Sequence, residues 1–319
     1  MPLDLTGSAF NKKPKAKDES ALPINSIATH KKETVVWRTS APKYKLDDLI
    51  LDEPVKELLL DVISFYKYRD KLMYEWGLNK RYADRVNLSI NLYGESGTGK
   101  TMAAHAIAHE LGKQIIFVDY AEIESKYVGE TAKNIKQLFH DAENLAAIII
   151  FDEADALLSK RVTDMRSSSD VSVNQTRSVL LNILNDYTGI VIFTTNFIQN
   201  FDPAFIRRIR YQIKFCLPNE ELRTRLWRMY IPKELPTDAD IAYLAAEFDG
   251  VSGSDISNTV FSAAIKAARR GLDIVLQTDF EEAMNQIQQA KRDNANGLMS
   301  IKKRIVSEDY VKEQLGDKF

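Results

Sequence analysis

The segment Ile90–Thr101 reads INLYGESGTGKT, and it decides the fold. A short apolar stretch leads into a glycine-rich loop that ends in Gly99, Lys100 and Thr101, and Met102–Ile107 follows as a helix candidate. The glycines let the backbone curl so that its N–H groups point at phosphate oxygens, while the start of the following helix adds its positive end. Because strand, loop and helix occur in the required order, the segment predicts a phosphate-binding loop rather than a turn without a ligand.

Each member of this loop has an expected contact with a bound nucleoside triphosphate. Lys100 is expected to reach the β- and γ-phosphates, and the Thr101 hydroxyl is expected to ligate Mg²⁺. The predicted cofactors are therefore ATP and Mg²⁺. The residues expected to contact the nucleotide here are Gly94, Glu95, Ser96, Gly97, Thr98, Gly99, Lys100, Thr101 and Met102.

A second apolar run, Ile148–Phe151, ends in the acids Asp152 and Glu153. A buried strand would carry Asp152 to the phosphates, where it holds Mg²⁺ directly or through its water shell, and Glu153 would polarise the attacking water. Taken alone, two acids at a strand end fit a helix cap equally well, but the phosphate loop upstream favours catalysis. Asn196 ends the next apolar run and is expected to hydrogen-bond the γ-phosphate or the water.

The cluster Arg207–Arg210 carries three arginines around Ile209. Such a cluster is often only a solvated face. Phosphoryl transfer, however, typically uses an arginine from the same chain or from a neighbour to stabilise the transition state. Because the phosphate loop contains no arginine, we interpret the cluster as one that is offered to a neighbouring subunit.

Apolar runs alternate with helical stretches up to Pro218, and only helical stretches follow it. The expected strands are Ser89–Tyr93, Gln114–Asp119, Ala146–Phe151, Gly189–Thr194 and Tyr211–Leu217. A helix is expected before the first strand, at Asp52–Lys71, and the helices between the strands are expected at Thr101–Leu111, Thr131–Glu143 and Asn174–Leu184. Such alternation predicts a parallel sheet covered by helices on both faces. The later helices are expected at Glu220–Tyr230, Asp238–Phe248, Gly253–Arg270 and Thr278–Lys291, with Asp238 and Thr278 as N-caps.

These patterns divide the 319 residues into four parts. Residues 1–44 are polar and are expected to form a flexible arm, with order near Val35–Trp37, where Trp37 could dock on this subunit or on a neighbour. Residues 45–217 are expected to form an α/β nucleotide-binding domain, and residues 218–292 a small helical lid. Residues 293–319 are expected to form a tail with a polar link and a short helix near Ser307–Leu315.

Composition narrows the possible partners. The 43 basic and 45 acidic side chains give a net charge of −2, which provides no global basic field and so disfavours nucleic acid as a partner. The chain has no apolar run of about 18 residues, so no membrane span is expected. The single cysteine, Cys216, lies in an apolar run and is expected to be buried in a strand; with no internal disulfide to form, it fits a cytoplasmic location.

Over about residues 46–290 the order of these motifs resembles the classical AAA clade of the AAA+ ATPases, whose members include katanin, spastin and the proteasomal ATPases. The resemblance implies an α/β P-loop NTPase domain with its parallel sheet sandwiched by helices, followed by a small all-helical lid domain. It also implies a ring, usually a hexamer, with active sites between subunits. The residues it assigns are the trans-acting arginine fingers Arg207 and Arg210, and the adenine contacts Asp48, Leu49, Gly253 and Ser254.

The segment Ser125–Glu130 resembles the first pore loop of that clade, which combines an aromatic, a hydrophobic residue and a glycine. In the family these loops line the channel of the ring and grip an extended polypeptide, and an aromatic ring suits gripping without sequence preference. Without the resemblance, Tyr127 would be interpreted as a packing residue at the start of a helix. The pore-loop residues assigned in this way are Lys126, Tyr127, Val128 and Gly129, and Arg161–Asp170 would form the second pore loop.

The chain departs from the family pattern at three places. Glu95 and Ser96 replace two prolines, which brings a negative charge near the phosphates, and Ile209 replaces the glycine between the two fingers. The segment Asp48–Leu51 has no glycine where many relatives have one.

His105 and His109 are four residues apart on the helix that follows the phosphate loop. A metal site needs further ligands, and no Glu follows His105 as in a zinc protease signature. Both histidines are therefore interpreted as structural.

The leading hypothesis is an ATPase that remodels, unfolds or disassembles protein substrates by threading polypeptide through a ring. A nucleic-acid-associated AAA+ factor, such as a loader or a transposition or defence helper, is the alternative, and DNA-stimulated hydrolysis would favour it. A third possibility is a scaffold that assembles under the control of ATP and turns it over slowly.

Overall fold

The computed structural model describes residues 37–82, 87–119, 130–159, 168–196 and 201–301. Residues 120–129, 160–167 and 302–319 lie outside these ranges. The predicted first pore loop up to Gly129, most of the second pore loop and the predicted C-terminal helix are therefore not among the described residues. Within the described ranges, no helix is both long and apolar enough to cross a membrane.

A parallel sheet of five strands forms the centre of the first domain, with the order β2-β3-β4-β1-β5. The strands are β1 (Leu88–Gly94), β2 (Ile115–Asp119), β3 (Ile148–Asp152), β4 (Ile190–Thr195) and β5 (Tyr211–Phe215). The inner strands β1, β3 and β4 are buried along most of their length and rich in β-branched side chains, as expected for strands covered on both faces. The edge strands β2 and β5 are partly exposed, and Phe117 in the middle of β2 is 40% exposed. Because all pairs are parallel, the carboxyl ends of β1, β3 and β4 meet at one edge, and the polar residues of the sequence motifs follow there.

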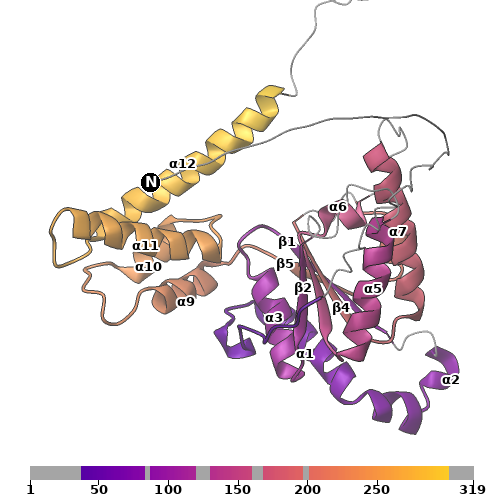
Figure 1. Ribbon diagram of the computed structural model, residues 1–319. Coiled ribbons are helices and arrows are strands. Elements are labelled where there is room, and N and C mark those ends of the chain that lie inside the picture. The colour runs from indigo at the N-terminus through magenta and orange to yellow at the C-terminus, as the bar shows by residue number, and fades with distance from the viewer. Residues whose placement is uncertain (1–36, 83–86, 120–129, 160–167, 197–200, 302–319) are drawn as a thin grey trace, which may run out of the picture. The chain divides into compact units, whose positions relative to one another are not determined.

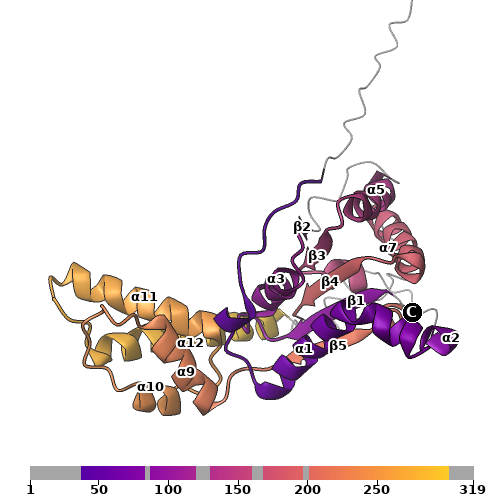
Figure 2. The ribbon, with the colours of Figure 1, turned by 90° about the horizontal axis from the view of Figure 1, so that it is seen from below.

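Helices cover both faces of this sheet, which confirms the predicted sandwich (Figures 1 and 2). The helices α1 (Glu53–Lys67) and α3 (Lys100–Glu110) pack on one face, and α5 (Glu130–Asn144) and α7 (Ser168–Asp186) on the other. Short helices complete the domain: η1 (Leu46–Asp48), η2 (Lys71–Glu75), α2 (Asn79–Tyr82), α6 (Asp155–Leu158) and α8 (Pro203–Ile206).

Two of the predicted segments reach into the described part of this domain. The predicted flexible arm, 1–44, is attached to the sheet in its last part, because Ser40 exchanges two 2.9 Å backbone hydrogen bonds with Ile115 and Trp37 is buried. The helix α7 begins at Ser168, so the last three residues of the predicted second pore loop, 168–170, belong to its first turn.

The second domain consists of four helices: α9 (Glu220–Tyr230), α10 (Ile241–Glu247), α11 (Gly253–Arg269) and α12 (Gln277–Ile301). They enclose their own apolar core, in which the Trp227 and Phe280 rings meet edge to face at 6.0 Å. The helical lid expected from the sequence is therefore present.

Both N-cap predictions in the lid were wrong. Asp240 caps α10 by accepting hydrogen bonds from Ala242 N (2.9 Å) and Tyr243 N (3.2 Å), whereas Asp238 accepts one from Gln277 N (2.7 Å) and so joins two segments distant in sequence. Thr278 lies inside α12, because the helix begins one residue earlier. The same helix continues to Ile301, so the polar link expected from residue 292 is helical in its first part.

Candidate nucleotide-binding site

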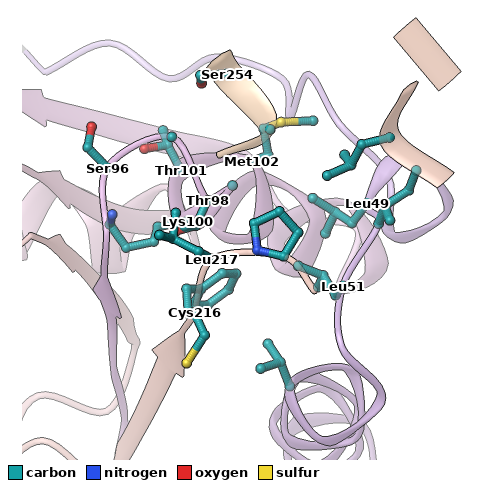
Figure 3. Close-up of a pocket in the computed structure, with 18 of the residues that line it drawn as sticks. Leu49, Leu51, Ser96, Thr98, Lys100, Thr101, Met102, Cys216, Leu217 and Ser254 are labelled. Atoms are coloured by element: carbon teal, nitrogen blue, oxygen red, sulfur yellow. The ribbon is translucent and has the colours of Figure 1, made fainter. Parts of the chain in front are cut away.

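A cavity of about 380 Å³ opens at the carboxyl ends of β1, β3 and β4. The phosphate loop, the strand ends and the residues after η1 form its walls in the α/β domain, and α9 and the start of α11 close it from the lid (Figure 3). This is the place where open parallel sheets bind their ligands.

Two glycines of the loop are required by their surroundings. Gly94 has a φ of +140°, and a Cβ atom there would lie 1.9 Å from the Phe215 carbonyl oxygen. Gly97 has a φ of +75°, and its Cβ would lie 2.5 Å from Ser252 Oγ. At the same position Ser254 N donates a 3.2 Å hydrogen bond to Gly97 O, so the loop touches the lid directly.

The Lys100 ammonium is buried and surrounded by oxygen atoms. It donates hydrogen bonds to Gly94 O (2.9 Å), Glu95 O (2.8 Å) and Asn196 Oδ1 (2.9 Å). Burial lowers the pKa of Lys100, and the nearby carboxylates of Asp152, Asp155 and Glu95 oppose that shift. A buried ammonium group in this position is suited to donate hydrogen bonds to phosphate oxygens.

Thr101 and Asp152 lie together, as the sequence predicts. Thr101 Oγ1 donates a 3.0 Å hydrogen bond to Asp152 Oδ1, and the Thr194 hydroxyl donates to the same carboxylate oxygen. The described residues contain no group of three or more His, Cys, Asp or Glu side chains that could hold a metal. A single carboxylate with a hydroxyl fits Mg²⁺, which is usually bound by one or two carboxylates together with substrate phosphates and water.

Glu153 and Asn196 line the cavity beside these residues. The backbone of Glu153 has a φ of +49°, a left-handed conformation that costs a non-glycine residue of order 1–3 kcal/mol and tends to occur at functional sites. Its N–H lies 3.4 Å from Thr194 Oγ1. The predicted acid and amide therefore face the same space as Lys100 and Asp152.

Asp155 is a site residue that the sequence analysis missed. It accepts a hydrogen bond from the Thr195 hydroxyl and a longer one, 3.5 Å, from Asn196 N, and it begins α6 directly after β3. The sequence does place Asp155 near the site, because it stands two residues after Glu153 at the end of the same apolar run. Its carboxylate fixes the backbone that presents Asn196.

The remaining wall of the cavity is mainly apolar, and all four predicted adenine residues, Asp48, Leu49, Gly253 and Ser254, line the cavity. Further residues of this wall were not predicted: Ile50, Leu51, Val55, Leu217, Pro218, Leu222, Leu226, Met229 and Tyr230. By contrast, Gly94 and Glu95 do not line the cavity, and the Glu95 side chain is exposed.

The prediction for Cys216 was wrong. The cysteine is exposed because β5 ends at Phe215, one residue before it, and its side chain lies at the cavity (Figure 3). An apolar run does not reveal where its strand ends, and Pro218 marks that end only approximately.

Two other predicted groups lie away from the cavity. Neither Arg207 nor Arg210 lines it, and both side chains are exposed. His105 has the expected packing role: its Nδ1 accepts a 3.2 Å hydrogen bond from Lys43 N, and its ring lies between those of Tyr44 (5.8 Å) and Phe117 (6.0 Å). Burial lowers the pKa of His105, a shift that the charge of Lys43 increases and that of Asp152 opposes.

Fold and site together define a P-loop nucleoside triphosphatase that closes its nucleotide cavity with a helical lid. Comparison with known families specifies the class: residues 90–219 match the ATPase family associated with various cellular activities (AAA), and residues 238–282 match the AAA+ lid domain. The chain therefore belongs to the AAA ATPases, and this membership indicates ATP hydrolysis.

Curated relatives agree with this assignment. The chain is 36% identical over 223 residues to the proteasome-activating nucleotidase of Saccharolobus solfataricus, which covers 67% of this chain and 56% of the relative. It is 30% identical over 292 residues to the ATP-dependent zinc metalloprotease FtsH of Acidimicrobium ferrooxidans, covering 89% of this chain and 43% of the relative. The chain thus spans about half the length of these relatives.

Proposed function

We propose that this chain is a Mg-ATP-dependent ATPase that remodels, unfolds or disassembles proteins by threading polypeptide through the pore of a ring. The observation that carries the proposal is the convergence of Lys100, Asp152, Glu153 and Asn196 on one cavity that the lid helps to form. Relatives named for activating a proteasome and for ATP-dependent proteolysis support protein as the substrate.

Each polar residue of the cavity has a separate role in the proposed reaction. Lys100 binds the β- and γ-phosphate oxygens. Asn196, whose Oδ1 accepts a hydrogen bond from Lys100, contacts the γ-phosphate or the water. Glu153 orients the attacking water and accepts its proton as the bond from water to the γ-phosphorus forms; the bond from the γ-phosphorus to the bridging oxygen breaks, and that oxygen leaves with ADP. Thr101 and Asp152 would hold Mg²⁺, which neutralises charge on the phosphates when it is bound.

The transition state needs positive charge that the cavity supplies only in part. Lys100 is the one basic residue among those described around the cavity. Arg207 and Arg210, exposed on the same chain, are proposed to act in the site of an adjoining copy, as trans-acting arginines do in other phosphoryl-transfer enzymes. This arrangement requires a ring or another head-to-tail assembly, and a hexamer is the form we propose.

The polypeptide is proposed to contact the segment Lys126–Gly129, with Tyr127 as the gripping residue. The lid contacts the phosphate loop through Ser254 and Gly97. We propose that the lid rotates against the α/β domain during nucleotide turnover, and that this rotation moves the segment Lys126–Gly129. A cytoplasmic location is part of the same proposal. No observation favours the alternative of a nucleic-acid-associated factor.

The test is Glu153→Gln in the full chain. The variant is expected to bind ATP as tightly as the wild type and to lose hydrolysis at least about 100-fold, because only the water-activating group is removed. Polypeptides captured with ATP and identified by mass spectrometry would then name the substrate class. Glu247→Gln, on an exposed acid of α10 outside the cavity, is the matched control. Undiminished turnover in Glu153→Gln would remove the assigned role, and recovery of nucleic acid in place of protein would support the alternative.

A further inference from the structure

The arginines of the cluster Arg207–Arg210 have three different environments. Arg208 donates hydrogen bonds to Asn185 Oδ1 (2.8 Å) and Ala204 O (3.0 Å), which ties it to α7 and α8. Arg207 is exposed, and no hydrogen bond or ion pair to its side chain is found among the described residues. Arg210 is exposed too, but its guanidinium carbon lies 4.0 Å from the centre of the Phe65 ring.

Phe65 belongs to the core and not to the surface. It lies on α1, is 7% exposed, and takes part in the apolar cluster that joins α1 to the sheet. The helix α1 packs on β5, which starts at Tyr211, directly after the arginine cluster (Figure 2). This packing brings the Phe65 ring to the end of the cluster, where it contacts Arg210. The position of Arg210 is thus set by a residue that cannot move without disturbing the core.

Tyr211 provides a second contact. Its ring centre lies 5.4 Å from the guanidinium carbon of Arg210. Burial raises the pKa of Tyr211, and the charge of Arg210 and its side-chain hydrogen bond with the phenol oppose that shift, while Asp61 adds to it. The guanidinium is therefore in contact with aromatic groups from α1 and from β5.

An aromatic ring is an unusual partner for an arginine that is meant to bind phosphate, and it has a specific advantage. The ring takes the flat face of the guanidinium, whereas phosphate oxygens are bound by its N–H edge. The long side chain is thereby ordered before its target arrives. Catalytic groups that are oriented in advance lose less entropy in the transition state.

We propose that Phe65 is a positioning residue for ATP hydrolysis: it holds the Arg210 guanidinium in the orientation that reaches the γ-phosphate bound to an adjoining copy of the chain. The inference rests on the proposed trans-acting role of Arg210. It predicts that a change inside the core of one subunit lowers turnover in the site of its neighbour.

Three variants of α1 separate this role from simple core packing. Phe65→Leu keeps an apolar side chain but removes the ring face, Phe65→Tyr keeps the face, and Val62→Ala removes buried volume elsewhere on the same helix. Phe65→Leu is expected to lower kcat about 10-fold with KM for ATP changed less than about 2-fold. Phe65→Tyr is expected to restore kcat, and Val62→Ala to lower the melting temperature without lowering kcat.

A mixing experiment locates the defect. Lys100→Met subunits cannot turn over ATP, but they carry an intact Phe65 and Arg210. Mixed with Phe65→Leu subunits, they are expected to raise hydrolysis several-fold above either preparation alone. Mixtures of Phe65→Leu with Arg210→Ala are expected to show no gain, because both lack a properly placed Arg210. Sedimentation in Mg-ATP confirms that every variant assembles as the wild type does.

The outcomes separate the two claims. If Arg210→Ala lowers kcat strongly but Phe65→Leu does not, or if Phe65→Leu and Val62→Ala lose activity in parallel with stability, the positioning role of Phe65 is wrong while the role of Arg210 stands. If Arg210→Ala hydrolyses ATP at the wild-type rate, the proposed trans role fails, and the inference about Phe65 fails with it.

Discussion

The two walls of the nucleotide cavity are built in different ways. The wall at the sheet edge is polar, and hydrogen bonds connect its residues, Lys100 with Asn196 and Thr101 with Asp152. The wall shared with the lid is apolar, and it meets the phosphate loop through the contact of Ser254 with Gly97. We propose from this difference that the first wall performs the chemistry, whereas the second contacts the base and links the lid to the phosphate loop.

The largest effect is expected in the polar wall. Lys100→Met removes the only basic side chain among the described residues that line the cavity, so ATP turnover should fall at least about 1,000-fold. A colorimetric phosphate assay measures it, and circular dichroism checks the fold. The exposed lysine Lys133→Met is the control, and its rate should match the wild type. A Lys100→Met variant with more than a tenth of wild-type turnover would contradict the division of labour between the walls.

A smaller but still large effect is expected where the walls touch. Gly97→Ala places a methyl group 2.5 Å from Ser252 Oγ on a backbone with φ of +75°, so the loop and the lid must separate. We expect ATP affinity, measured by calorimetry, to fall about 10- to 100-fold.

Gly112→Ala is the matched control for this variant. Gly112 has a φ of +62°, but nothing lies within 4 Å of its Cβ position, so only backbone strain is added. It should lose about 1–2 kcal/mol of stability, the cost of a left-handed conformation for an L-residue, and bind ATP normally. Equal affinity in Gly97→Ala and wild type would mean that the contact between the walls has no part in binding.

The same contrast explains what the sequence could predict. The polar wall follows from short local motifs, in which Gly99, Lys100 and Thr101 adjoin one another and strand ends place Asp152 and Asn196 at one edge. The apolar wall is formed by residues of α9, such as Leu226 and Tyr230, whose helical spacing only predicts a buried face. Which face meets the nucleotide is a matter of tertiary packing, and no local pattern encodes it.

A medium effect should appear at the apolar wall through Cys216. It is the only cysteine of the chain, it is exposed, and it lines the cavity, so a thiol reagent reports on this wall alone. Saturating ATP is expected to slow alkylation by N-ethylmaleimide about 10-fold, as followed by mass spectrometry. Lys100→Met should show less protection at the same ATP concentration. Alkylation that ATP does not slow would place the base away from Cys216.

The smallest effect concerns His105, which lies behind the phosphate loop on α3. Its folded pKa is lowered from the ordinary value of 6.5, so between the two values the unfolded chain binds more protons than the folded one. The contribution of His105 to the free energy of unfolding is therefore fully present above about pH 6.5, and it decreases as the pH falls from there towards the folded pKa. His105→Asn keeps a hydrogen-bond acceptor for Lys43 N but cannot titrate, so urea unfolding at pH 5 and pH 7.5 should differ less in this variant than in the wild type. An unchanged difference would show that other groups cause the acid sensitivity, and that the neutral packing of this histidine contributes nothing to holding the loop helix against residues 43–44.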